Sequence, residues 1–270
     1  MAYRAPMLDT APHPTVGNLL REWRQRRRLS QLDLACDAEI STRHLSFLET
    51  GRAQPSRGML LKLADQLDVP LRARNTLLTA AGFAATYPER PLDAPALEPA
   101  RRAVELVLQG HEPFPALAVD RHWMLVAANA AVAPLLAGAA PGLLAPPVNV
   151  LRLSLHPEGL APRIENLGEW RAHLLQRLRH QLAASADPVL AGLLSELEAY
   201  PGRASAAHPR DDLAGVAVPL RLRVGSGRVL SFLSTTTVFG TPADVTLSEL
   251  ALECFFPADE TTRAALGGKP

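Results

Sequence analysis

The sequence has few of the features that place a protein in a membrane or outside the cell. Its 270 residues contain no apolar run of the roughly 18 residues that a membrane-spanning helix needs. Residues 1–14 include three prolines and have no apolar core of signal-peptide length. We therefore expect a cytoplasmic protein that does not associate with a membrane.

Cysteine is also scarce, since Cys36 and Cys254 are the only two in the chain. Thiols in a reducing compartment rarely pair, so we expect no disulfide. Cys36 follows Ala35 in an apolar helical pattern, and Cys254 precedes two phenylalanines. Both positions are typical of small buried residues.

The motifs of common catalytic and metal sites are missing as well. The eight histidines form no H-x-x-x-H pair, the cysteines form no C-x-x-C pair, and no G-x-S-x-G elbow occurs. There is no phosphate-binding glycine loop and no internal repeat. The hydroxyl-rich residues 234–237 are ordinary in an alternating strand. We therefore expect no enzyme activity, no metal and no catalytic cofactor.

Residues 30–51, by contrast, carry a strong positive signal. Ser30 and Ser41 stand where a hydroxyl can accept the unpaired N–H groups at the start of a helix, and Gly51 stands where a helix stops. Leu45 and Leu48 share the apolar face of the second helix. Two short helices separated by about three residues predict a helix-turn-helix.

The open face of the second helix is polar and carries no acidic residue, as entry into a DNA groove requires. Arg43 could donate two hydrogen bonds to a guanine edge. Phe47 could lie against a thymine methyl, or it could pack on the neighbouring loop and contact no base. The expected DNA-contacting residues are Gln31, Ser41, Thr42, Arg43, His44, Ser46, Phe47, Arg52 and Arg57.

The charge distribution favours the same partner. Residues 1–80 contain twelve Lys and Arg against eight Asp and Glu, and five of these arginines lie within residues 21–28. Residues 81–270 have a slight acidic excess. A basic excess confined to one part of the chain is typical of a nucleic-acid-binding module.

Residues 19–70 resemble the xenobiotic-response-element, or phage-repressor-like, helix-turn-helix family. The matching features are Leu29-Ser30-Gln31, Leu34-Ala35, Ser41, Leu45, the run from Leu48 to Arg52, Pro55, and the stripe Leu60, Leu63, Ala64 and Leu67. The resemblance implies a lambda-repressor-like, all-α bundle of five helices. It also implies a structural ion pair between Arg24 and Glu49. For the whole chain we expect a homodimer on double-stranded DNA with a palindromic operator.

Prolines mark the end of this module. Residues 88–99 contain four of them, which favours an extended linker over a helix. Residues 101–109 could form a connecting helix. We divide the chain into a loose arm (1–14), a DNA-binding domain (15–87), a linker (88–104), a second domain (105–258) and a loose tail (259–270).

The second domain alternates between strand and helix patterns. Candidate strands cover residues 115–120, 122–128, 216–224, 228–239 and 246–256, and candidate helices cover residues 130–136 and the stretches after Asn166 and Asp187. Two sets of strands separated by helices predict an α+β domain with a mainly antiparallel sheet. Helices on one side of that sheet could enclose a cavity.

Several patches in this domain resemble the ligand-binding domain of MmyB-like transcription regulators. They lie at 116–129, 149–159, 166–170, 232–237, 239–247 and 256–259. The resemblance implies a PAS-like fold and a small, largely apolar effector, and in one branch of the family a fatty acid occupies the pocket. The candidate ligand-contacting residues are Trp123, Asn129, Arg152, His156, Trp170 and Phe232, with Arg163 as an alternative partner for an acid headgroup.

These candidates have structural alternatives. The tryptophans and Phe232 could be plain core residues, Asn129 could cap a helix, and His156 could belong to a turn. Two functions follow for the domain. It could bind an effector that controls a DNA-binding regulator, or it could serve only as a dimerisation or partner-binding module.

Overall fold

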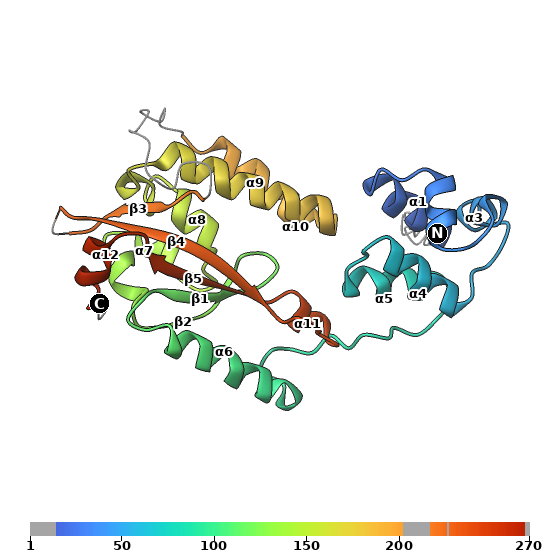
Figure 1. Ribbon diagram of the computed structural model, residues 1–270, viewed down its shortest axis with the longest axis horizontal. Helices are drawn as coiled ribbons and strands as arrows, with labels where there is room; N and C mark the ends of the chain where they lie inside the picture. The colour runs from blue at the N-terminus through green and yellow to red at the C-terminus, as the bar shows by residue number, and fades with distance from the viewer. Residues whose placement is uncertain (1–14, 202–216, 226, 268–270) are drawn as a thin grey trace, which may run out of the picture. The chain divides into compact units, whose positions relative to one another are not determined.

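The computed structural model describes residues 15–201, 217–225 and 227–267, and the chain divides into two compact units, one ending at Pro88 and the other beginning at Glu89. The first unit is helical (Figure 1). Its helices are α1 (Val16–Arg26), α2 (Gln31–Asp37), α3 (Thr42–Glu49), α4 (Arg57–Gln66) and α5 (Leu71–Ala80). The predicted bundle of five helices is confirmed.

Side-chain caps set the starts of these helices. The hydroxyls of Thr15, Ser30, Ser41 and Ser56 each accept the backbone N–H three residues further on. At α2 the cap is reciprocal, because the Asp33 carboxylate accepts the N–H of Ser30 at 2.8 Å. Since such caps satisfy backbone groups locally, they are visible in the sequence.

The core of the first unit is made of leucines contributed by all five helices. Its fully buried members include Leu20, Leu34, Leu45, Leu48, Leu60, Leu63, Leu77 and Leu78. Gly17 allows α1 to approach the end of α3, since a Cβ there would lie 2.6 Å from the carbonyl oxygen of Leu48. Any larger residue would push the two helices apart.

The expected burial of Cys36 is wrong, because its side chain is exposed. Leu34 and Ala38 are both buried in the bundle. Residues four apart share a helix face, whereas Cys36 is two residues from each of them and points away.

The second unit contains a five-stranded sheet with the order β2-β1-β5-β4-β3, in which every neighbouring pair is antiparallel. The strands are β1 (Ala116–Val119), β2 (Leu125–Ala128), β3 (Leu220–Arg223), β4 (Val229–Val238) and β5 (Ala251–Pro257). The α-helices are α6 (Glu98–Gly110), α7 (Pro141–Leu144), α8 (Val150–Leu155), α9 (Leu167–Ser185), α10 (Pro188–Ala199), α11 (Val245–Ser248) and α12 (Glu260–Ala265). The described residues of this unit also form the 3-10 helices η1 (Pro95–Leu97), η2 (Ala133–Leu136) and η3 (Ala161–Arg163). The predicted α+β class is confirmed.

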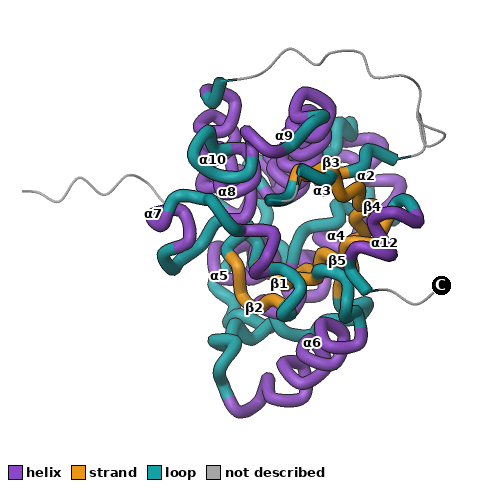
Figure 2. Tube along the Cα trace, turned by 90° about the vertical axis from the view of Figure 1, so that its left-hand side faces the viewer, coloured by secondary structure: helices purple, strands orange, loops and turns teal. Residues whose placement is uncertain are grey.

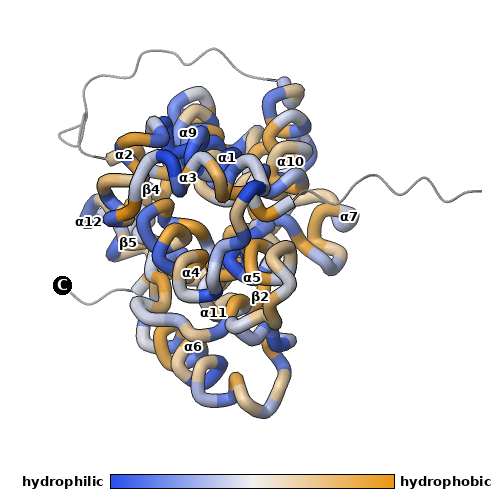
Figure 3. The backbone as a smooth tube through the Cα atoms, turned by 90° about the vertical axis from the view of Figure 1, so that its right-hand side faces the viewer, coloured by the Kyte–Doolittle hydropathy of each residue, from blue (hydrophilic) through white to orange (hydrophobic). Residues whose placement is uncertain are grey.

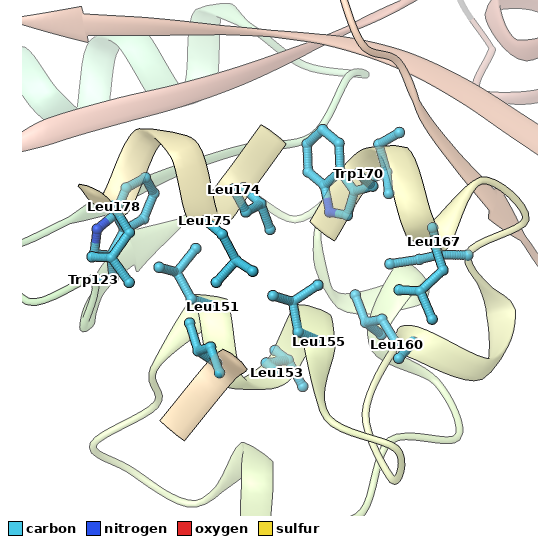
Figure 4. Packing of buried hydrophobic residues seen from close by; sticks show 14 of the residues in the cluster. Trp123, Leu151, Leu153, Leu155, Leu160, Leu167, Trp170, Leu174, Leu175 and Leu178 are labelled. Carbon is cyan, nitrogen blue, oxygen red and sulfur yellow. The ribbon is translucent and has the colours of Figure 1, made fainter. Parts of the chain in front are cut away.

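Helices cover both faces of this sheet (Figure 2). On one face α6 packs Val104 and Leu108 against Leu252 and Cys254 of β5. On the other face lie α8, α9 and α10, and Figure 4 shows the leucines of α8 facing those of α9. Successive residues of a strand face opposite sides, so Glu253 and Phe255 point toward the α8–α9 layer.

Some predicted elements differ in length or type. The strand expected at 122–128 starts only at Leu125, because the Asp120 carboxylate accepts the N–H groups of His122 and Met124 and forms a turn. The helix expected at 130–136 is reduced to η2, and β3 is shorter than the strand expected at 216–224. The predicted loop at 203–215 and the predicted arm at 1–14 lie outside the described residues.

Structure also continues into both segments that the sequence suggested were irregular. Within the expected linker, η1 and the start of α6 are helical. Within the expected loose tail, α12 begins after the capping residue Asp259. Thr262 is fully buried and its hydroxyl accepts the N–H of Ser231 in β4 at 2.9 Å. That tertiary hydrogen bond, invisible in the sequence, fixes the segment against the sheet.

Candidate DNA interface and ligand cavity

The second helix of the helix-turn-helix, α3, has one buried and one open face. Leu45, Leu48 and Glu49 are buried. Arg43 is exposed, and the other predicted base contacts on this helix, Thr42, His44, Ser46 and Phe47, are partly exposed. The open face therefore presents hydroxyls, an imidazole and a guanidinium, which can hydrogen-bond to base edges.

The Phe47 ring is close to two cations. The guanidinium carbon of Arg43 is 5.3 Å from the centre of its ring, and that of Arg52 is 5.9 Å away. Such cation–π contacts contribute about 0.5–1 kcal/mol at exposed sites. The ring thereby limits the directions of both arginines, while direct contact between Phe47 and DNA stays a prediction.

Behind this face, Arg24 and Glu49 form the predicted ion pair. Arg24 Nε and Nη2 donate to the two carboxylate oxygens of Glu49 at 2.6 and 2.9 Å. The Glu49 side chain is fully buried. Burial raises the pKa of Glu49, but hydrogen bonds from Arg24 and Gln31 and the charges of Arg24 and Arg21 outweigh it and hold the pKa below its ordinary value. The pair joins α1 to α3.

Three other candidate contacts have partners within the unit. Gln31 Nε2 donates to Glu49 at 2.8 Å, so this amide supports the ion pair as well as standing at the start of α2. Ser41 caps α3 through the N–H of His44, and Arg57 Nη2 donates to the Thr86 hydroxyl at 2.8 Å. Contacts of these residues with DNA stay predictions.

The sequence did not reveal the role of Arg27. Its guanidinium donates to the carbonyl oxygens of Leu67 and Asp68 at 2.7 and 2.8 Å and lies over Trp23. These carbonyls follow α4, so Arg27 ties α1 to the end of α4. Arg26 and Arg28 beside it are exposed.

The second unit contains a cavity of about 100 Å³ between the sheet and the helices α8 and α9. Its lining is predominantly apolar. The lining residues are Leu117, Trp123, Leu125, Val132, Leu136, Val150, Leu151, Leu153, Ser154, Leu160, Trp170, Leu174, Arg177, Leu220, Glu253 and Phe255. Trp123 and Trp170, two of the predicted ligand contacts, are among them.

Each of these tryptophans is held by a hydrogen bond from its indole nitrogen. Trp123 Nε1 donates to the Gln181 side chain at 2.7 Å, and Trp170 Nε1 donates to the Ser154 hydroxyl at 3.0 Å. Trp123 has a φ of +64°, a conformation that L residues rarely adopt. The turn at Asp120 stabilises it, since the Trp123 N–H donates to the Asp120 carbonyl at 3.0 Å.

An ion pair that the sequence analysis missed lies at the cavity wall. Arg177 of α9 donates to the two Glu253 carboxylate oxygens at 2.7 and 3.1 Å. Thr236, which pairs with Glu253 across β4 and β5, donates to the same carboxylate at 3.0 Å. The one available signal was an acidic residue inside the apolar strand 251–257, since a buried carboxylate needs a partner.

The other predicted ligand contacts, Asn129, Arg152, His156 and Phe232, are not among the residues that line this cavity, and their contact with a ligand stays a prediction. Asn129 does not cap a helix. Its side chain accepts the Ala116 N–H and donates to the carbonyl oxygens of Leu108 and Phe114, which joins α6 to β1. Phe232 is completely buried and packs edge-on against Phe255.

The basic candidates have partners elsewhere. Arg152 is bound by the Glu196 carboxylate of α10, with its shortest contact at 2.7 Å. Arg163 donates to the Leu135 carbonyl at 2.8 Å, and burial lowers its pKa. His156 is a turn residue, since its Nδ1 accepts the N–H of Glu158. The sequence could not assign the partner of Arg152, because that contact depends on how α8 packs on α10.

Residues 100–267, more than half of the chain, match the family described as the MmyB-like transcription regulator ligand binding domain. The chain belongs to this family. Residues 15–77 of this MmyB-like regulator match a helix-turn-helix domain. Both resemblances noted in the sequence are thereby confirmed, and the protein is a DNA-binding transcription regulator.

One solved structure is similar to part of the chain. The clp gene regulator ClgR from Corynebacterium glutamicum is 24% identical to this MmyB-like regulator, with 38% of this chain and 99% of that chain covered and a TM-score of 0.23. No curated protein matches the chain.

Across residues 15–201, 217–225 and 227–267, no helix is long and apolar enough to cross a membrane. The same residues include no group of three His, Cys, Asp or Glu side chains placed to hold a metal ion.

Proposed function

We propose that this regulator acts in the cytoplasm as a homodimer on a two-fold symmetric operator, and that a small apolar or acyl effector in the cavity of the second unit controls it. The cavity between α9 and the sheet, lined by Trp123, Trp170 and leucines, is the observation that carries the proposal. A predominantly apolar lining with few polar groups is typical of a small-molecule site, and at about 100 Å³ this cavity is smaller than the roughly 300–1,000 Å³ pockets of drug-sized ligands.

In this proposal α3 enters the major groove of each half-site. Arg43 reads a base edge, and Arg52 holds the phosphate backbone. Two recognition helices on one face of B-DNA imply half-sites about 34 Å apart. The exposed position of Arg43 beside Phe47 supports its role in reading.

Control by an effector requires differential affinity. A ligand changes DNA binding only if it binds the DNA-competent form and another form of the protein unequally. The change in operator affinity on adding ligand therefore measures the ratio of the two ligand affinities. A fatty-acid-like molecule is one candidate for the effector.

The proposal can be tested with a matched pair of buried variants. Leu174 and Leu193 are equally buried on neighbouring helices, but only Leu174 lines the cavity. Leu174→Phe should fill the cavity and abolish any ligand-dependent change in operator affinity, whereas Leu193→Phe should keep it. Overpacking costs about 1–3 kcal/mol at either site, so loss of stability alone does not separate the two.

The operator would first be selected from random DNA with the full-length protein. Small molecules that the protein retains from a cell extract would then be identified by mass spectrometry. Each would be added back to an assay of operator binding. Equal responses of Leu174→Phe and Leu193→Phe would refute the cavity as the effector site.

A second function, a dimerisation or partner-binding module without an effector, is favoured by the surface of α6. Leu106 and Val107 of this amphipathic helix are exposed, and hydrophobic and hydrophilic colours alternate along it (Figure 3). That function predicts that Leu106→Glu weakens dimerisation and operator binding together, and that no added small molecule changes operator affinity. Glu105→Gln, a change at the neighbouring exposed position, is the control.

A further inference from the structure

We propose that residues 130–147 form a lid over the cavity of the second unit, through which the effector enters, and that Arg163 is the latch that holds this lid closed. The inference deepens the proposed function and rests on it, because it concerns access to the same cavity.

The size of the cavity requires a wall that moves. Its volume is about 100 Å³, whereas pockets for drug-sized ligands occupy roughly 300–1,000 Å³. A molecule of that size fits only if part of the lining shifts. Because folded interiors are close-packed, the part that shifts is the part with the fewest connections to the rest of the unit.

Most of the lining belongs to elements that are firmly held. Leu117 and Phe255 lie on β1 and β5, which are paired with each other and with further strands. Leu174 lies on α9, and the hydrogen bonds between Arg177 and Glu253 tie this helix to the sheet. Moving either wall would break several hydrogen bonds at once.

The lid is built differently. It contributes Val132 and Leu136 to the lining, and it consists only of alanine, leucine, valine, proline and glycine. Prolines and glycines interrupt this apolar sequence, which forms the short helices η2 and α7. In Figure 2, α7 lies at the edge of the second unit. Since the lid has no charged or polar side chain, it moves without breaking an ion pair of its own.

Both ends of the lid are fixed. Asn129, just before it, is buried and its side chain forms three hydrogen bonds with backbone groups. Just after it, the Val148 carbonyl accepts the N–H of Leu125 at 2.8 Å, and Asn149 caps α8. Gly138, between η2 and α7, has a φ of +85°. Fixed ends around a short-helical middle allow that middle to swing while the chain on either side stays in place.

The middle of the lid is weakly held. Two of the described hydrogen bonds join residues 133–145 to the rest of the unit. The N–H of Ala140 donates to the Glu158 carbonyl at 2.9 Å, and Arg163 Nη2 donates to the Leu135 carbonyl at 2.8 Å. The rest of the attachment is apolar packing against the core.

The contact with Leu135 makes Arg163 a latch that releases. Burial lowers the pKa of Arg163, so its guanidinium is partly removed from water. Its partner is a neutral carbonyl oxygen, and a hydrogen bond to a neutral acceptor is weaker than one to a carboxylate. When the lid opens, the guanidinium regains water, which offsets the lost bond.

Opening also gives the effector a way to act. An open lid withdraws Val132 and Leu136 from the core, and an apolar molecule in the enlarged cavity restores the lost burial. The empty and occupied forms then differ in the position of the lid. A ligand that binds these forms unequally shifts the equilibrium between them.

The test measures opening directly and needs neither effector nor DNA. A cysteine in place of Leu174 lies at the cavity, and one in place of Leu193 is equally buried away from it. Both are placed in the full-length protein with Cys36→Ser, which removes an exposed thiol. The rate of reaction with methyl methanethiosulfonate, followed by mass spectrometry of the peptides, reports how often each site opens. We expect Leu174→Cys to react roughly tenfold faster than Leu193→Cys.

The ratio of these two rates tests the latch and the lid separately. Arg163→Met removes the N–H groups that bind Leu135, and it should raise the ratio by roughly tenfold. Gly138→Ala leaves the space around the new Cβ open but places a side chain at positive φ, so it should raise the ratio by a smaller factor.

Matched controls exist for both variants. Arg152→Met removes a guanidinium whose partner Glu196 does not line the cavity. Gly227→Ala introduces the same strain in the turn between β3 and β4, where φ is +77° and the space around a Cβ is equally open. Neither control should change the ratio.

An unchanged ratio in a folded Arg163→Met protein overturns the inference, and so do equal rates for the two cysteines without further substitution. If Arg163→Met does not fold, Gly138→Ala decides in the same way. These failures leave control by an effector intact, because that control is tested separately with Leu174→Phe and Leu193→Phe.

Discussion

The two units each contain a buried arginine–glutamate pair, and the difference between these pairs shows how surroundings decide the role of the same chemistry. Glu49 is enclosed by Arg24 and Gln31 and joins two helices of the first unit. Glu253 is bound by Arg177 and Thr236, but the pair lines a cavity. The first pair is a structural connection, whereas the second lies in the wall of the cavity and presents hydrogen-bonding groups to it.

The largest effect is expected when the first pair is broken. Glu49→Ala leaves the Arg24 cation in a largely buried position, which costs about 3–5 kcal/mol for a buried pair. Hydrogen exchange of the full-length protein measures the loss in the unit that carries each substitution, in α1 and α3 for Glu49→Ala and in α8 and α10 for Glu196→Ala. Glu196→Ala is the control, because its pair with Arg152 is more than a third exposed and should cost about 1 kcal/mol or less. Equal losses of stability in both variants would show that an enclosed pair is worth no more than an exposed one.

A smaller effect is expected on the surface that the first pair supports. Arg43→Ala should weaken binding to the selected operator by about 1–3 kcal/mol and relax the preference at one base position. Arg52→Ala should weaken binding to all DNA sequences alike. Titrations against the operator and against variants at each base pair measure both changes. If Arg43→Ala weakens all sequences equally, Arg43 is a backbone contact and our assignment is wrong.

The smallest expected effect is a pH-dependent loss of stability in the second unit, and it depends on His173. The first unit should lose stability only at a lower pH. Burial lowers the pKa of His173 below its ordinary 6.5, and the nearby charge of Arg177 adds to this. The unfolded chain therefore binds a proton that the folded chain excludes, so the second unit should lose stability as the pH falls below about 6.5. The pKa of Glu49 is also depressed, but its contribution to the stability of the first unit is lost only as the pH falls below about 4.5.

Hydrogen exchange between pH 7.5 and 4 follows both units in one experiment. His173→Gln should remove the early loss in the second unit and leave the first unit unchanged. If the first unit opens before the second on acidification, the ordering inferred from these two groups is incorrect.

Local signals explain what could be predicted from the sequence. The caps at Ser30, Ser41 and Asp187 each bond a backbone N–H two or three residues away, so the start of the helix is encoded next to the cap. Asn166 shows the limit of this logic. It precedes α9 as predicted, yet its side chain binds Pro219 and Arg221 near β3 and does not cap the helix.

The sequence by itself determined the two-unit plan, the helix-turn-helix with its polar face, the Arg24–Glu49 pair and the antiparallel α+β class, because periodicity, caps and family motifs are local. Only the tertiary structure decided which polar residues meet at the cavity. Arg177 and Glu253 are 76 residues apart in sequence, and α9 must pack on the sheet at the register that pairs Thr236 with Glu253 before they touch. Partners brought together by packing leave no spacing in the sequence, which is why neither Arg177 nor Glu253 was predicted at the cavity.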